Sequence, residues 1–239
     1  MKKPILVLVL PLAVVALSIL LYIRYWDNET DDFVCGITEV EHHGLTYGTV
    51  LSNGRCWLDR NLGASRVATS STDEEAYGDL YQWGRATDGH EKRNSDTTWG
   101  ADFTLSSSDT PGHGNFIVAP YSPWDWRNPR NDNLWQGVNG INNPCPPGWR
   151  LPTADEWDAE RNSWSSNNSA GAFASPLKLP MSGLRKNIGP IDPLGPGGYY
   201  WSSTVDDNYS WYLGFFRNDD SFMMSYFRSL GLSVRCIRD

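Results

Sequence analysis

The sequence predicts an α+β fold of small antiparallel sheets, two helices and long loops, preceded by one N-terminal transmembrane helix. Three observations lead to this class. The uncharged apolar run 4–23 is about 20 residues long, which is enough to cross a bilayer. Two segments begin with the spacing of a helix capping box. The C-terminal quarter consists of short aromatic-rich runs with alternating polarity, which are typical of antiparallel strands.

The N-terminal run is expected to stay in the membrane. Lys2 and Lys3 precede it and residues 24–26 follow with an interfacial pattern, so the bulk of the chain should lie outside the cytoplasm. The only candidate cleavage site, at 16–18, would leave apolar residues exposed at the new N-terminus. The predicted organisation is a signal anchor (1–26), a linker (27–34) and one extracytoplasmic domain (35–239).

Composition indicates a loop-rich, aromatic domain. The chain has 12 Trp, 11 Tyr, 8 Phe, 22 Gly and 15 Pro, which favours turns held together by ring packing. Its net charge is −8; removing residues 1–32 takes away three basic and four acidic residues, which leaves 17 − 24 = −7. Because no basic stripe is present, nucleic acid is excluded as a partner.

The first elements predicted in the domain are a hairpin and a helix. Residues 45–51 alternate as a strand, an Asn-Gly turn follows, and 55–58 return. Thr72 can cap a helix with Glu75 at the third position, and this helix should continue to Gly84.

Residues 86–143 lose all regular pattern and are predicted to form long loops. Asp125, Asp132 and Asn133 could ligate a structural Ca²⁺, but they lack EF-hand spacing. We therefore assign no cofactor and no metal ligand, and expect these side chains to be solvated.

A proline-rich turn at 144–148 leads into the second helix. Thr153 is a suitable N-cap and Glu156 stands at the capping-box position. Trp157 and Trp164 then follow at helical spacing, so one face of this helix carries two indoles.

The remaining strands are predicted at 199–203, 211–216, 221–228 and 232–237. On the second of these, Trp211, Leu213 and Phe215 share one face, whereas Tyr212, Gly214 and Phe216 share the other. One layer cannot bury both faces, so one aromatic set should be exposed or should pack under the 86–143 loops.

Four segments carry a resemblance to a known family. Cys-Pro-x-Gly-Trp-Arg-Leu-Pro-Thr-x-x-Glu-Trp at 145–157 resembles the signature of the Fibrobacter succinogenes major paralogous domain family. The segments 56–62, 198–204 and 231–236 are similar to the same family and occur in the same order. The resemblance spans 35–239 and implies a C-type-lectin-like fold in a bacterial surface protein.

The segment Arg150-Leu151-Pro152-Thr153 is also similar to formylglycine-generating enzymes, which use a reactive cysteine pair in their C-terminal part. Here that part contains only Cys236. The resemblance therefore implies the fold, and no catalytic residue is assigned. A formylglycine-generating-type oxidoreductase remains the alternative function.

Four cysteines in an exported domain predict two disulfides, with three possible pairings. We expect Cys35–Cys56, which would close the N-terminal hairpin, and Cys145–Cys236, which would tie the proline-rich turn to the last strand. The second bond closes a long loop and should contribute about 4 kcal/mol to stability. It also resembles the long-range disulfide of lectin-like domains.

The predicted function is non-catalytic binding of a protein or glycan ligand, because loops and strands near 205–228 mix large rings with short polar groups. The candidate binding residues are Asp206, Asp207, Asn208, Tyr209, Trp211, Tyr212, Phe216, Arg217, Asn218, Asp219, Met224, Tyr226 and Phe227. This segment also resembles the variable region of diversity-generating-retroelement target proteins. A purely structural surface module is the further alternative.

Overall fold

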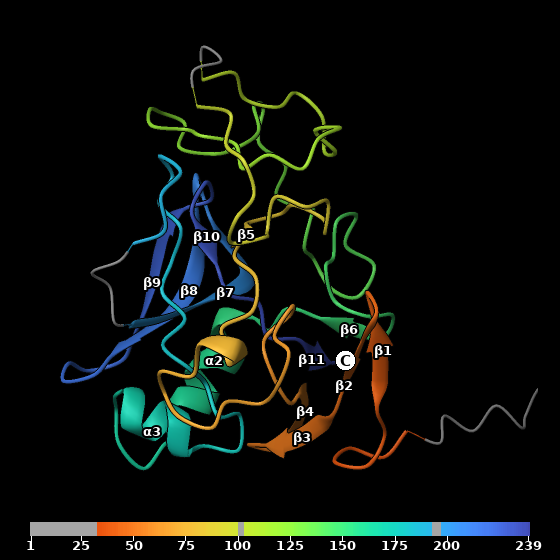
Figure 1. The fold of residues 1–239 in the computed structure, drawn as a ribbon, viewed down its shortest axis with the longest axis vertical. Helices are drawn as coiled ribbons and strands as arrows, with labels where there is room; N and C mark the ends of the chain where they lie inside the picture. The colour runs from red at the N-terminus through yellow and green to blue at the C-terminus, as the bar shows by residue number, and fades with distance from the viewer. Residues whose placement is uncertain (1–32, 100–102, 193–196) are drawn as a thin grey trace, which may run out of the picture. The chain divides into compact units, whose positions relative to one another are not determined.

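The computed structural model describes residues 33–99, 103–192 and 197–239 (Figure 1). The predicted signal anchor lies outside these residues, as does all but the end of the predicted linker. No helix within the described ranges is long and apolar enough to cross a membrane. Residues Cys35–Asp239 form one compact unit.

The described strands form four antiparallel sheets, of two, two, four and three strands, accompanied by two α-helices. This agrees with the predicted α+β class. The elements are β1 (Val40–His42), β2 (Leu45–Tyr47), β3 (Thr49–Ser52), β4 (Arg55–Leu58), the 3₁₀ turn η1 (Glu74–Ala76), β5 (Tyr81–Gln82), β6 (Trp149–Arg150), α2 (Ala154–Asn162), α3 (Ser169–Ala174), β7 (Gly197–Asp206), β8 (Tyr209–Phe216), β9 (Phe222–Phe227), β10 (Gly231–Leu232) and β11 (Ile237–Arg238).

The N-terminal hairpin forms, but its first strand is divided. β3 pairs with β4 around the Asn-Gly turn, whereas β2 pairs with β1. The break falls at Gly48, where an added Cβ would lie 2.6 Å from Oδ2 of Asp59. The backbone therefore passes too close to Asp59 for a side chain, and the predicted strand 45–51 becomes two.

The helix predicted from Thr72 to Gly84 is wrong, because only η1 forms there. The Asp73 carboxylate accepts hydrogen bonds from the backbone and hydroxyl of Thr69. Gly78 then adopts a φ of +67°, and a Cβ at this position would lie 2.3 Å from the Leu62 carbonyl oxygen. This tight turn redirects the chain, so that β5 extends and pairs with β10.

The second predicted helix is confirmed as α2. Thr153 accepts from the backbone N–H of Glu156, and the Glu156 side chain accepts from the backbone N–H of Thr153, which completes the capping box. α3 was not predicted; Asn168 caps it by accepting from the backbone N–H groups of Ala170 and Gly171.

The C-terminal strands are confirmed in part. β7, β8 and β9 form one antiparallel sheet in that order. The predicted last strand, 232–237, is instead divided: β10 joins β5, and β11 lies between β4 and β6. One face of the three-stranded sheet packs on α2, α3 and the main hydrophobic core, which comprises Trp57, Trp157, Ala172, Leu177, Leu179, Met181, Tyr200, Leu213, Phe215 and Ile237.

The two disulfides join Cys35 to Cys56 and Cys145 to Cys236, the pairing predicted from the sequence. Disulfides form and persist in oxidising compartments. They therefore indicate an extracytoplasmic location for the domain.

Between β5 and β6 the described residues contain no helix or strand, as predicted for 86–143. Two buried arginines brace these loops: Arg228 joins them to the β7–β8 turn, and Arg85 joins parts of the irregular region to each other. Arg228 donates to Asp132 (2.7 Å) and to the Asp207 carbonyl oxygen (2.9 Å). Arg85 donates to the carbonyl oxygens of Asn115 (2.9 Å) and His113 (3.1 Å). These bonds satisfy loop carbonyls that no sheet or helix reaches.

Candidate ligand-binding site

The β7–β8–β9 sheet has two faces that differ in what covers them. Residues directly opposite each other on antiparallel strands share a face, and the register pairs Tyr212 with Met224 and Gly214 with Phe222. Leu213 and Phe215 therefore point the other way, into the core, where both have no exposure. We call the first side, which carries Tyr199, Tyr212, Phe222, Met224 and Tyr226, the cavity face.

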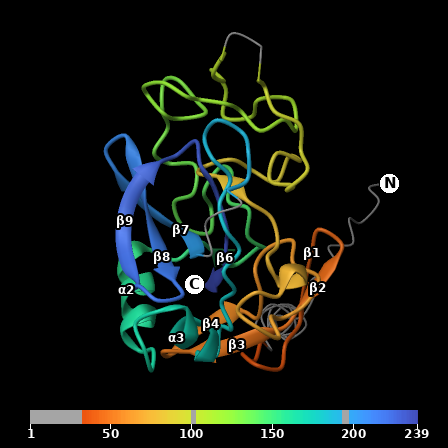
Figure 2. The ribbon, with the colours of Figure 1, turned by 60° about the vertical axis from the view of Figure 1, so that its left-hand side comes forward.

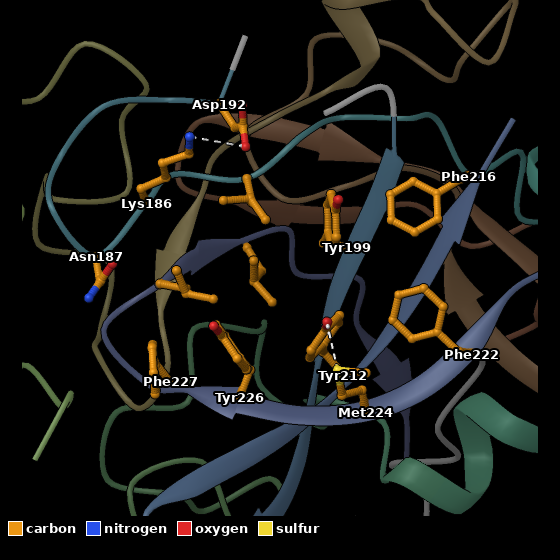
Figure 3. Close-up of a pocket in the computed structure, with 13 residues that line it drawn as sticks. Lys186, Asn187, Asp192, Tyr199, Tyr212, Phe216, Phe222, Met224, Tyr226 and Phe227 are labelled. Carbon is orange, nitrogen blue, oxygen red and sulfur yellow. Dashed lines mark hydrogen bonds and ion pairs between the residues drawn. The ribbon is translucent and has the colours of Figure 1, made fainter. Parts of the chain in front are cut away.

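A cavity of about 460 Å³ lies over this face (Figure 3). Aromatic and aliphatic side chains make up most of its wall, with a few polar groups at one side. Its lining residues are Leu184, Lys186, Asn187, Asp192, Tyr199, Tyr212, Phe216, Phe222, Met224, Tyr226, Phe227, Leu230 and Leu232. This size and chemistry are typical of sites that enclose a small ligand or one large side chain.

Gly214 shapes the cavity by letting a ring lie flat on the sheet. A Cβ at Gly214 would stand 2.4 Å from Cζ of Phe222, the residue opposite it on β9. Phe222 also packs against Phe216 and Tyr212, with ring centroids 5.7 and 6.0 Å away. The glycine thus makes room for a continuous aromatic wall.

The wall facing the sheet comes from the segment 184–192. Arg185 exchanges backbone hydrogen bonds with Gly231, which fixes this segment beside β10. Lys186 and Asp192 form an ion pair of 3.3 Å at the rim, and the Asn187 side chain donates to the Ala119 carbonyl oxygen. Charged and amide groups therefore stand beside an apolar interior, as Figure 3 shows.

The tyrosines supply neutral hydroxyl groups inside the cavity. The Tyr212 hydroxyl lies 3.6 Å from the Met224 sulfur, to which it donates. Burial raises the pKa of Tyr212 to about 12, and burial likewise raises the pKa of Tyr199. Both phenols therefore keep their protons at physiological pH; Tyr212 donates its hydrogen bond to Met224, and its oxygen can still accept a hydrogen bond from a ligand.

Of the candidate residues, five line the cavity: Tyr212, Phe216, Met224, Tyr226 and Phe227. Trp211 is not among the lining residues, because it stands opposite Ser225, on the other face. Tyr209 packs on Phe227 from the neighbouring strand, with ring centroids 5.8 Å apart.

The polar candidates lie in two turns at opposite ends of β8. Asp207 and Asn208 form the β7–β8 turn beside Asp206 and both accept from Arg130. Arg217, Asn218 and Asp219 are exposed in the β8–β9 turn. Eight residues of extended strand separate the turns, roughly 26 Å, so they cannot belong to one small site.

The cavity is also lined by Tyr199, Phe222, Leu230, Leu232 and the whole 184–192 wall, none of which was among the candidate residues. Tyr199 could have been found, because it alternates with Tyr200 on β7 and so had to lie on the face opposite the core residue. The 184–192 segment carries no periodic signal, and only its tertiary contacts with β10 bring it here.

A second group of side chains, Asp88, His90 and Glu91, has the composition of a metal site. His90 is fully buried, and its Nε2 accepts from the backbone N–H of Gln82 at 3.0 Å. Its Nδ1 therefore carries the proton and donates to Asp88 at 2.6 Å. Burial lowers the pKa of His90 to about 4. With both nitrogens engaged, the imidazole has no free lone pair for a metal.

Two of the three candidate calcium ligands, Asp125 and Asp132, face a buried guanidinium, and among the described residues Asn133 forms no hydrogen bond with it. Asp125 is buried, so the expectation that it is solvated is wrong. Arg228 lies 2.7 Å from Asp132 and 4.0 Å from Asp125. Burial raises the pKa of Asp125 to about 6, against the opposing effect of Arg228. Asp125 and Asp132 are thus placed around a positive charge that the chain itself supplies.

Comparisons with protein-family models, with curated proteins and with solved structures found no match for this chain.

Proposed function

We propose that this chain is a membrane-anchored, extracytoplasmic binding protein without catalytic activity, whose ligand enters the cavity over the β7–β8–β9 sheet. The observation that carries the proposal is the aromatic cavity itself, about 460 Å³ in volume and lined by side chains of β7, β8, β9 and β10, of the 184–192 segment and of Leu230. Ligand sites are commonly apolar hollows with a few placed polar groups.

The proposed architecture is that of the Fibrobacter succinogenes major paralogous domain family, with a C-type-lectin-like fold anchored by residues 4–23. The motif at 145–157 supports this proposal, because its residues form a helix cap and a disulfide that fix the turn before α2. Thr153 and Glu156 form a capping box, and Cys145 is bonded to Cys236. Small antiparallel sheets combined with long loops are consistent with such a fold.

The cavity suits a ligand that presents an apolar group with hydrogen-bonding neighbours. The side chain of a protein partner and the apolar face of a sugar ring both have this character. Rings of Tyr199, Phe222 and Tyr226 offer flat surfaces, and Lys186 and Asp192 offer charge at the rim. Both ligand classes belong to the binding function that the sequence predicts.

We favour binding over the formylglycine-generating alternative because that chemistry uses a reactive thiol, whereas all four cysteines are paired in disulfides. A thiol count on denatured, unreduced protein tests this choice. No free thiol above background labelling is expected for two intact disulfides. A labelled Cys145 or Cys236 would return thiol chemistry to consideration.

The binding function can be tested with ¹³C-methyl methionine NMR on the full-length chain in lipid nanodiscs. Met224 is 48% exposed at the cavity, Met181 is 4% exposed in the core, and Met223 lies on the opposite face of β9. N-acetyl-phenylalanine amide and a panel of oligosaccharides serve as probes. A probe that enters the cavity should shift the Met224 signal in a saturable way and leave Met181 in place.

Matched variants locate the binding. Tyr226→Ala removes a 42% exposed cavity ring and should abolish the Met224 shift, whereas Tyr121→Ala removes a 69% exposed ring from the 86–143 loops and should not. Loss of binding in both variants, or in neither, would contradict the proposed site.

A further inference from the structure

The strand β9 forms an edge of its sheet. It pairs with β8 on one side, and no described strand pairs with it on the other. Figures 1 and 2 both place β9 at the outer side of the β7–β8–β9 sheet. Backbone hydrogen bonds already occupy both ends of this edge. At its start, the Ser221 N–H donates to the Asn167 carbonyl oxygen, and at its end the Leu230 N–H donates to the Phe227 carbonyl oxygen. The open part therefore runs from Phe222 to Tyr226.

This open part has none of the devices that usually protect an edge strand. Natural sheets blunt their edges with charged residues, prolines or bulges. The residues Phe222-Met223-Met224-Ser225-Tyr226 contain no charge, no proline and no glycine, and their pairing with β8 is regular throughout. An unguarded edge of this length can accept another extended chain by backbone hydrogen bonding.

The same strand forms one wall of the cavity. Phe222, Met224 and Tyr226 project from β9 into it, as Figure 3 shows. A chain added along β9 would lie about 4.8 Å away, with every second side chain on the cavity face. Met224 and Tyr226 are the most exposed large apolar side chains of β9, at 48% and 42%, so the rim is accessible from this side.

Charge selects the kind of chain that fits. Exposed carboxylates stand near both ends of β9: Asp219 and Asp220 lie in the turn before it, and Asp206, at the end of β7, accepts a hydrogen bond from the Ser225 hydroxyl of β9. Among the described residues neither Asp219 nor Asp220 forms an ion pair, and Arg217 is the one basic residue in that turn. The remainder of the chain after residue 32 carries 17 − 24 = −7. A basic segment is attracted by this arrangement, whereas a second copy brings the same acidic turns.

We infer that β9 receives an extended segment of a partner protein by strand addition, with alternate apolar side chains over the cavity and basic residues at the segment's ends. The inference rests on the proposed binding function and specifies its ligand as a protein strand. The backbone of β9 supplies the hydrogen bonds, and the cavity selects the side chain.

The test uses a fluorescent peptide probe, Lys-Lys-Thr-Val-Thr-Phe-Thr-Val-Lys-Lys, and the full-length chain in nanodiscs. Fluorescence anisotropy should show saturable binding, and the Met224 methyl signal should shift while that of Met181 stays in place. Replacing the four lysines with glutamates should weaken binding about tenfold or more, because acidic ends then meet acidic turns.

N-methylation of the peptide distinguishes strand addition from simple filling of the cavity. Alternate amides of a strand point to opposite edges, so methylating the Thr amides and methylating the Val and Phe amides block different edges. One of the two methylated peptides should lose binding and the other should keep it. Equal affinity of both would overturn the inference, because binding would not use a backbone edge.

Variants on the protein test the charge argument. The double variant Asp219→Asn, Asp220→Asn should reduce the preference for the lysine peptide over the glutamate peptide, whereas the control Asp155→Asn, an exposed carboxylate on α2, should leave it unchanged. An unchanged preference in the double variant would refute the assigned polarity of the partner.

The remaining outcomes separate this inference from the proposed function. If N-acetyl-phenylalanine amide shifts Met224 but no peptide binds, the cavity is a ligand site and the strand-addition inference is wrong. If neither probe binds, both fail. A concentration-dependent dimer in sedimentation velocity that Met224→Lys abolishes, without peptide binding, would assign the edge to a second copy and overturn the inference.

Discussion

The two faces of the β7–β8–β9 sheet are formed by alternate residues of the same three strands, yet one face is buried in the core and the other lines the cavity. On the core face, Leu213 and Phe215 have no exposure and pack with Trp157 and Tyr200. On the cavity face, Met224 and Tyr226 keep nearly half of their surface exposed. Alternation decides which residue stands on which face, whereas the covering element decides whether that face becomes core or site.

The largest expected difference between the faces is in stability. Phe215→Ala should lower the free energy of unfolding by about 3–5 kcal/mol, because it opens a hole in the closed core. Phe216→Ala, one residue on and facing the cavity, should lower it by about 1 kcal/mol. Urea denaturation measures both. Similar losses would show that the cavity face is part of the core and would break the comparison.

A change of pH tests whether the two faces differ in anything besides packing. The aromatic and aliphatic side chains on both faces do not titrate between pH 4 and 7. His90, which lies on neither face, does titrate in this range. Burial lowers the pKa of His90 to about 4, below its unfolded value of about 6.5. The unfolded state binds more protons in this window, so stability is lost as pH falls from about 6.5 to about 4, by about 3 kcal/mol.

This loss should disappear in His90→Gln, so the stability difference between wild type and variant should shrink as pH falls. The pKa of Asp125 is raised to about 6, so this residue makes stability rise as pH falls. It does so equally in wild type and in His90→Gln, and its contribution therefore cancels in the difference between them. The gap between Phe215→Ala and Phe216→Ala should stay constant over the same range. A gap that varies with pH would mean that a titrating group couples to one face.

A smaller effect is expected at Gly214, where the two strands approach on the cavity face. Gly214→Ala places a Cβ 2.4 Å from Cζ of Phe222 and should cost about 1–3 kcal/mol of stability. Adding Phe222→Ala removes the obstructing ring, so the double variant should recover at least about 0.5 kcal/mol relative to additivity. Strict additivity would contradict the assignment of the glycine to ring packing.

The smallest effect compares neighbours on β9. Met223→Ala should cost about 1–2 kcal/mol, because Met223 packs against the core cluster, whereas Met224→Ala should cost less than about 0.5 kcal/mol. Thermal unfolding of the two variants measures this order. A larger loss for Met224→Ala than for Met223→Ala would mean that Met224, and not Met223, packs against the core, which contradicts the assignment of the two faces.

Much of the fold could be predicted because local chemistry decided it. The capping box of α2 and the alternation of β8 and β9 are signals carried by adjacent residues. The pairing of Cys145 with Cys236, over a separation of 91 residues, is not a local signal. It was one of three possible pairings, expected because it would tie the proline-rich turn to the last strand and because it resembles the long-range disulfide of lectin-like domains.

The failures share another physical origin. The helix expected after Thr72 depended on spacing alone, and the close approach of Gly78 to the Leu62 carbonyl redirects the chain instead. The cavity wall at 184–192 is fixed by backbone bonds between Arg185 and Gly231. Neither contact leaves a periodic trace in the sequence, because both join segments that are distant along the chain. Of the candidate site residues, those on the cavity face of β8 and β9 are brought together, and those in the two turns are not.

The buried arginines have a consequence for how the domain resists proteases in an extracytoplasmic compartment. Secreted proteases cut chains that can be drawn out locally, and a long segment without helices or strands is ordinarily their preferred substrate. Here Arg85 binds the backbone oxygens of Asn115 and His113 in this region. Arg228 joins the Asp132 side chain of the same region to the Asp207 carbonyl oxygen, and its guanidinium lies 4.5 Å from the centroid of the Trp83 ring. A lysine, with one compact ammonium, could not grip several carbonyls in this way. These bonds restrain the irregular region, so it should resist proteolysis better than its lack of helices and strands suggests.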